Sequence, residues 1–102
     1  MKNSKYLNQC GGIIGHIGDG NFHVFFGVDT ENEAEFTELK YLSDEIAKLA
    51  LENNGTITGE HGIGLGKKHL LEMEVGGGSY NLMKLIKNTI DPKGIMNPGK
   101  IF

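Results

Sequence analysis

The sequence has few of the features that mark several common classes of protein. No hydrophobic run among its 102 residues approaches the roughly 20 residues that span a bilayer, and its start, MKNSKYLNQCGG, has no hydrophobic signal core. The single cysteine, Cys10, cannot form an internal disulfide, which favours a reducing compartment. Basic residues are not in excess, since the net charge is -3. The chain therefore has no positive field for nucleic acid or acidic membranes.

Large size and internal repeats are also absent. A chain of 102 residues fits one small domain, which buries about two thirds of its unfolded surface, and it holds no separate large catalytic domain. Glycine, in contrast, is abundant, with 16 residues. The glycines gather at particular loops, which indicates special backbone geometry there.

The first half of the sequence predicts two strands and a long helix. Residues 12–17 and 21–28 are rich in residues that favour strands, and the GDGN sequence between them is typical of a turn. Thr30 and Glu33 have capping-box spacing at the start of an apolar stripe that predicts a helix over 30–54. We expect Asn53, Asn54 and Gly55 to end it in a left-handed turn.

The second half predicts a short strand at 55–58 and helices at 67–74 and 79–90, the last capped by Ser79 after a glycine break at 76–78. We expect Asp91-Pro92-Lys93-Gly94 to stop that helix and the tail to be extended. The predicted fold class is α+β, a small, mainly antiparallel sheet with helices packed on one face. So few strands leave open sheet edges, which predicts docking onto another part or self-association.

The segment GHIGDGNFH places His16 and His23 on either side of the predicted turn, and Glu60 follows the predicted strand at 55–58. Two imidazoles and a carboxylate could supply the three protein ligands of a catalytic zinc site. Asp19 and Asn21 are better suited to shaping the turn through bonds from their side chains to the backbone. The alternative is that both histidines are ordinary surface or core residues.

His61 has a different predicted role from its neighbour Glu60. Adjacent residues of an extended segment point to opposite sides, so the two are equivalent ligands only if the loop bends sharply. A histidine beside a metal is suited to taking an alcohol proton, although it could equally be a loop histidine bonded to backbone. The following GIGLGKK lacks the pattern of a phosphate-binding loop, and Lys67, Lys68 and His69 are predicted to be an exposed helix face.

Three segments in this order, GHIGDGNFH, GTITGEHGIGLGK and DPKGIMNPGKIF, resemble the end of the FAD-linked oxidase C-terminal domain of flavoproteins of the vanillyl-alcohol oxidase type. The resemblance covers roughly residues 12–102, with residues 1–11 as an N-terminal extension, and implies part of the cap domain of a larger flavoenzyme. It implies that His16, His23 and Glu60 bind a divalent metal, zinc or manganese, and that His61 is the active-site base. Asn97 is implied to approach the FAD.

The implied reaction is oxidation of a D-2-hydroxy acid by hydride transfer to the flavin. Members of the hydroxyglutarate type have Asn two residues after the second metal histidine, where this chain has Phe25, so the resemblance favours a smaller acid, D-lactate. The FAD-binding domain is expected from a missing part or a partner subunit. The expected location is the cytoplasm or the periphery of an energy-transducing membrane, mitochondrial in a eukaryote. The alternative function is a stand-alone metal-binding domain that associates with itself through its open sheet edges.

Overall fold

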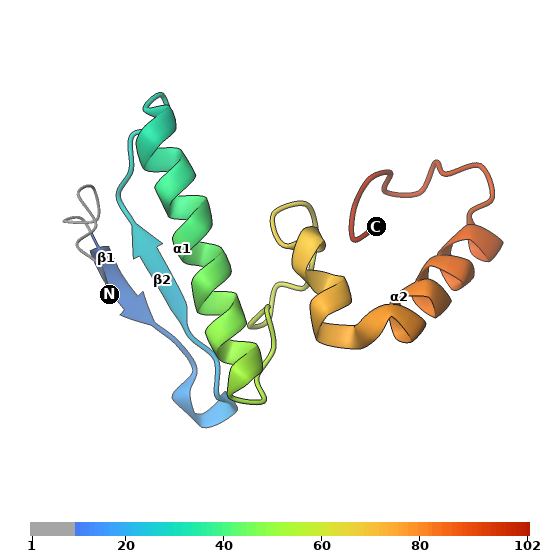
Figure 1. The fold of residues 1–102 in the computed structure, drawn as a ribbon, viewed down its shortest axis with the longest axis horizontal. Helices are drawn as coiled ribbons and strands as arrows, with labels where there is room; N and C mark the ends of the chain where they lie inside the picture. The colour runs from blue at the N-terminus through green and yellow to red at the C-terminus, as the bar shows by residue number, and fades with distance from the viewer. Residues whose placement is uncertain (1–9) are drawn as a thin grey trace. The chain divides into compact units, whose positions relative to one another are not determined.

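The computed structural model describes residues 10–102, and the chain divides into two compact units, one ending at Ile46 and the other comprising Ala47–Phe102 (Figure 1). Residues 1–9, most of the predicted N-terminal extension, lie outside the described residues. The small sheet and two long helices confirm the predicted α+β class. No helix in the described part of the chain is both long and apolar enough to cross a membrane.

The sheet lies in the first unit and is an antiparallel pair, β1 (Cys10–Ile14) and β2 (His23–Phe26). Ile14 faces His23 at the end of the ladder that leads into the connecting loop. A bulge interrupts the register between Cys10 and Gly12. Both strands are shorter than predicted, because residues 15–22 form a structured loop with a short 3-10 turn, Ile17–Asp19.

Helix α1 (Glu33–Glu52) begins three residues later than predicted. The cap is Asn32, whose Oδ1 accepts bonds from the N–H groups of Ala34 and Glu35 at 3.2 and 3.4 Å. Glu35 Oε1 accepts a bond from the side-chain amide of Asn32 at 3.0 Å, so Glu35 supports the cap through the Asn32 side chain and not through the backbone N–H that a capping box uses. The prediction of Thr30 and Glu33 was therefore wrong by two residues, since Asn32 and Glu35 have the same spacing.

The predicted stop of α1 is confirmed. Asn54 has a φ of 60°, and the N–H of Gly55 donates to the carbonyl of Ala50 at 2.7 Å. This left-handed turn directs the chain into residues 55–66.

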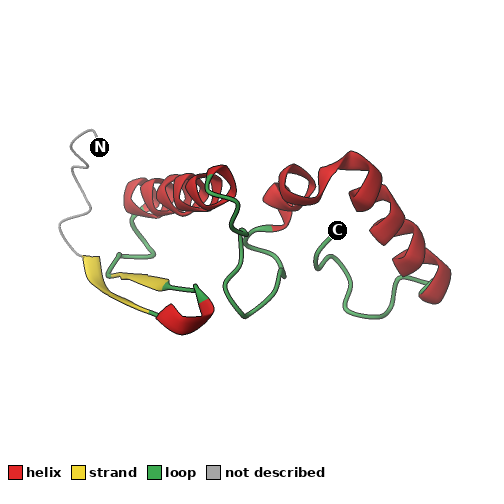
Figure 2. Cartoon of the chain, turned by 90° about the horizontal axis from the view of Figure 1, so that it is seen from below, coloured by secondary structure: helices red, strands yellow, loops and turns green. Residues whose placement is uncertain are grey.

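The predicted strand at 55–58 was wrong, since the second unit contains helix and loop but no strand (Figure 2). Ile57 does point into a core, as a strand residue would, but its backbone bonds go to side chains. The core consists of Ala47, Ile57 and Leu70, with Leu51 and Ile63 packed against it. Burial of Ile57 rather than pairing with the sheet accounts for the apolar sequence at this point.

Helix α2 (Leu71–Ile90) follows a 3-10 turn at Lys68–Leu70 and consists of two helical segments joined at a kink, which confirms the prediction of two helices around the glycine run. Gly76 has φ 75° and ψ 154°, so the helix kinks there, as the glycine run predicts. The helix resumes at once after the kink and continues through Ser79, which was therefore wrongly predicted as a cap.

The C-terminal segment after α2 is a series of turns, and the predicted extended tail was wrong. Asp91 ends the helix as predicted and is only 6% exposed. Its carboxylate accepts bonds from the N–H groups of Ile95 and Met96 at 3.0 and 2.9 Å and pairs with the Lys87 ammonium. These contacts turn the chain back sharply, which an extended segment would not do.

Candidate active site

The loop of residues 15–22 is organised around the backbone of His16. The His16 carbonyl accepts bonds from the N–H groups of Asp19 and Asn21 at 2.9 and 3.4 Å, and the His16 N–H donates to Asn21 Oδ1 at 2.8 Å. The predicted turn-shaping role is thus confirmed for the Asn21 side chain, whereas Asp19 contributes through its backbone. His16 is exposed at the start of this loop, and His23 is half-buried at its end.

A glycine is required at position 15 by close packing. A Cβ atom there would lie 2.2 Å from the carbonyl oxygen of Asn21 and 2.7 Å from the Cα of Phe22. Both are backbone atoms, so a side chain cannot be accommodated by a change of rotamer. The closeness of the two sides of the loop therefore depends directly on Gly15, the residue before His16.

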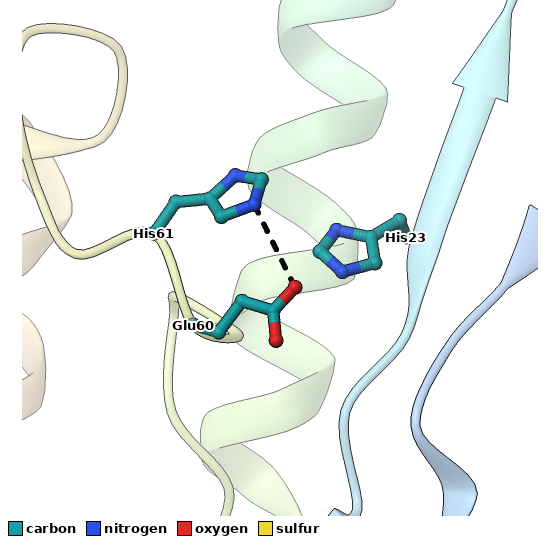
Figure 3. A group of neighbouring side chains, drawn as sticks. All are labelled: His23, Glu60 and His61. Carbon is teal, nitrogen blue, oxygen red and sulfur yellow. Dashed lines mark ion pairs between the residues drawn. The ribbon is translucent and has the colours of Figure 1, made fainter.

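Glu60 and His61 lie on the loop of the second unit and point toward each other (Figure 3). The Nε2 atom of His61 is 3.7 Å from Glu60 Oε1, with the side chains 79% and 42% exposed. The loop bends sharply here, which was the condition for the two neighbours to be equivalent ligands. An imidazole and a carboxylate so placed, and open to solvent, can bind an ion or exchange a proton with a bound molecule.

This bend is maintained by contacts that the sequence did not predict. Thr58 Oγ1 donates to the carbonyl of Gly62 at 3.1 Å, which closes the loop around Glu60 and His61. The carboxylate of Glu74, in the first turn of α2, accepts bonds from Thr56 Oγ1 and the Ile57 N–H at 2.6 and 3.1 Å. Sequence reasoning missed Glu74 because its partners are 17 and 18 residues away.

The lysines after the loop also have structural roles, so the prediction that they form an exposed face was wrong. Lys67 Nζ donates to the carbonyl of Ile57 at 2.7 Å. Lys68 Nζ donates to the backbone oxygens of Gly99 and Phe102, each at 3.1 Å. The N–H of Ile101 donates to the carbonyl of Gly64 at 2.9 Å, so the end of the described chain is fastened to the same loop. Only His69 of the three predicted residues is exposed.

Asn97 lies on the turns that follow Asp91 and has a φ of 48°. Its position is set from the preceding residues, because the carboxylate of Asp91 and the ammonium of Lys87 bind the backbone of Met96 on both sides. The Lys87 ammonium, with the N–H groups of Met96 and Ile95, holds the pKa of Asp91 below its ordinary value, although burial acts in the opposite direction.

The predicted metal ligands are distributed over both units. His16 and His23 belong to the first unit, and Glu60 belongs to the second. Two imidazoles and a carboxylate match the preferences of zinc, and none of the three residues is fully buried. Their joint binding of an ion stays a prediction.

Known proteins are similar to this chain over most of its length. A family model described as FAD linked oxidases, C-terminal domain, matches residues 5–101. The chain is 49% identical over 102 residues, all of this chain and 16% of the relative, to D-lactate dehydrogenase (cytochrome) 1, mitochondrial, of Saccharomyces cerevisiae. It is 46% identical over 94 residues to a probable mitochondrial D-lactate dehydrogenase of Danio rerio, covering 92% of this chain and 19% of the relative.

A third relative is the glycolate oxidase subunit GlcD of Bacillus subtilis, 43% identical over 100 residues. That match covers 97% of this chain and 21% of the relative. The chain thus spans between 16% and 21% of the length of these relatives.

Proposed function

The chain belongs to the family of FAD-linked oxidase C-terminal domains, and on this premise we propose that it is part of an FAD-dependent D-2-hydroxy-acid dehydrogenase acting on D-lactate. The observation that carries the proposal is the exposed Glu60–His61 pair, with 3.7 Å between its nearest polar atoms, on a loop fastened to a core. The names of the yeast and fish relatives support D-lactate as the substrate. The name of the bacterial relative supports glycolate as the second candidate.

His61 is the proposed catalytic base. Its imidazole takes the proton of the substrate hydroxyl, and the exposed position of the ring gives a bound molecule access to it. A bound flavin would supply the acceptor for the hydride that leaves C2 as the alcohol becomes a ketone, and a bound metal would supply polarisation of the hydroxyl oxygen. Glu60, beside the base, joins His16 and His23 as the proposed ligands of zinc or manganese.

Two further residues are assigned to binding. Phe25, on β2 and 52% exposed, offers an apolar surface to the methyl group of lactate, which favours lactate over acids with a second carboxylate. Asn97, on its left-handed turn, is proposed to approach the flavin. Most of the FAD site is proposed to lie in a further part of the protein or in a partner subunit, and the names of two relatives support a mitochondrial location in a eukaryote.

A chimera tests the role of His61. The segment of the yeast relative that matches this chain is replaced by residues 1–102, and D-lactate oxidation is measured with an artificial electron acceptor. We expect His61→Asn to lower kcat by about 10² to 10⁴, the usual contribution of a positioned base. His69→Asn, a change of the exposed histidine eight residues later, is the matched control. Near-normal turnover of the His61 variant would show that another group is the base.

Zinc binding to the full chain tests the ligands. Calorimetric titration of His16→Asn, His23→Asn and Glu60→Gln is expected to show weaker binding in each variant, with His69→Asn unchanged. Binding should weaken as the pH falls, because an imidazole must be neutral to bind a metal. Equal zinc affinity in all variants would rule out this ligand set.

A stand-alone, self-associating metal-binding domain is the second candidate. It is favoured by the small sheet, in which β1 and β2 form a ladder only with each other among the described residues, and by exposed apolar side chains such as Ile86 and Ile90, 51% and 68% exposed. Light scattering with metal analysis of the purified chain distinguishes the two. A stable dimer containing metal supports this candidate, and a monomer without metal contradicts it.

A further inference from the structure

The backbone of Ile57 is bound at both of its polar groups by charged side chains. The Glu74 carboxylate accepts the N–H bond at 3.1 Å, and the Lys67 ammonium donates to the carbonyl at 2.7 Å. The Ile57 side chain is 2% exposed in the core of the second unit. This residue therefore has little freedom of its own, and it fixes where the following loop begins.

Glu74 binds two consecutive residues at once. Its second oxygen accepts a bond of 2.6 Å from the Thr56 hydroxyl. Bonds to an ionised carboxylate are roughly twice as strong as those between neutral groups, and two of them fix direction as well as distance. The carboxylate thus sets the orientation of the chain as it enters the loop, and it does so from helix α2.

The exit of the loop is tied to its entry. The residue after Ile57, Thr58, donates its hydroxyl to the carbonyl of Gly62 at 3.1 Å, and Glu60 and His61 lie between these two ends. A shift of the Ile57 backbone is therefore expected to shift Glu60 and His61 as well, because the segment between them is short and closed by this bond. Misplacing a reacting group by about 1 Å can cost about 10²-fold in rate.

We propose that Glu74 is a positioning residue for the Glu60–His61 pair, with Thr56 and Lys67 as its partners in holding the loop. It acts on the pair through the loop, and it does not contact the substrate in the reaction proposed above. This inference rests on the proposed function only for its effect on turnover, since the effect on the loop can be measured independently.

The chain provides a matched control for charge on the same helix turn. Glu72 and Glu74 both lie in the first turn of α2, where a carboxylate favours the helix through its dipole. Glu72 is exposed, whereas Glu74 is half-buried and bonded to the loop. If the only role of Glu74 were to stabilise the helix, Glu72→Gln and Glu74→Gln would have similar effects.

The first test is amide hydrogen exchange in the full chain, with no cofactor present. We expect Glu74→Gln to speed exchange of the Ile57 amide, which donates to Glu74, by about ten- to a hundredfold, the range for loss of a bond to a charged group. Glu72→Gln should leave it unchanged. Thr56→Val should give a smaller increase in the exchange rate, and Thr56→Ser should leave the rate near that of the unchanged chain because serine keeps the hydroxyl. Equal exchange in the Glu72 and Glu74 variants would overturn the proposal.

The second test separates positioning from stability in the yeast chimera. Below the melting temperature, Glu74→Gln should lower kcat for D-lactate by about tenfold or more with little change in KM, since a displaced base weakens transition-state stabilisation more than binding. A lower melting temperature with unchanged kcat would show a purely structural role and refute positioning. If His61→Asn were harmless while loop exchange still depended on Glu74, the proposed function would fail and the control of the loop by Glu74 would stand.

Discussion

The two glycine-rich loops that carry the candidate site residues are held by different kinds of contact. In the loop of residues 15–22, His16 bonds to Asn21, five positions away, and the bonding groups are amides and carbonyls. The loop of residues 55–66 also has neutral bonds, from Thr58 to Gly62 and from Ile101 to Gly64, but its charged contacts come from Lys67 and Glu74, 10 to 18 positions from their partners. The first loop is determined locally, and the second depends on the packing of a helix.

The largest expected effect comes from removing the buried anchor of the second loop. Ile57→Ala should lower the free energy of unfolding by about 3 kcal/mol, since a buried Ile reduced to Ala typically costs 2–5 kcal/mol. Urea denaturation followed by circular dichroism measures the change. The same substitution in the other loop, Ile17→Ala, is the control, because Ile17 is 92% exposed and its loss should cost under about 0.5 kcal/mol. Similar values for the two variants would contradict the contrast between the loops.

A smaller decrease in the free energy of unfolding is expected from disturbing the close packing of the first loop. Gly15→Ala should destabilise the chain by about 2 kcal/mol, because the new Cβ would meet the Asn21 carbonyl oxygen at 2.2 Å and backbone must move. Gly18→Ala, three residues later, is the control, since a Cβ there has no atom within 4 Å. Thermal unfolding compares them. If Gly15→Ala were as well tolerated as Gly18→Ala, the two sides of the loop would not be packed as closely as described.

The contrast between the loops also explains which features the sequence predicted. The turn at 18–21, the role of Asn21 and the stop at Asn54 were predicted correctly because each depends on neighbours within a few residues. The cap of α1 was misplaced because Thr30 and Asn32 each have a Glu three positions later, and spacing alone does not choose between them. Neighbouring residues were therefore sufficient to predict a turn or a helix end wherever only one of them fitted the pattern.

The features that the sequence did not predict depend on distant residues. A strand was expected at 55–58 because Ile57 is apolar and β-branched, but its backbone bonds go to Glu74 and Lys67 and not to the sheet. Neither side chain has a local signal, since a Glu in a first turn and a Lys before a helix are ordinary surface residues. The candidate residues His61 and Glu60 could be named from their motif, whereas the contacts that hold them could not.

The smallest expected effect is a loss of stability at low pH, where Asp91 becomes protonated. It would distinguish contacts that need a charge from contacts between neutral groups. The pKa of Asp91 is lowered by Lys87 and by the N–H groups of Met96 and Ile95. A carboxyl with a lower pKa in the folded chain binds protons less readily when folded. Its contribution to stability is therefore present above its ordinary value of 3.8 and is lost as the pH falls below that value.

Exchange of the Ile95 and Met96 amides against pH, by NMR, measures this effect. Both amides donate to Asp91, so their protection should fall below pH 3.8, and Asp91→Asn should remove that dependence. The amide of His16 is the internal control, because its acceptor is the side-chain amide oxygen of Asn21, which does not titrate in this range. Protection at Ile95 that persisted below the lowered pKa would show that the turn does not need the carboxylate charge. The C-terminal turns would then resemble the neutral first loop, because their shape would come from backbone geometry alone.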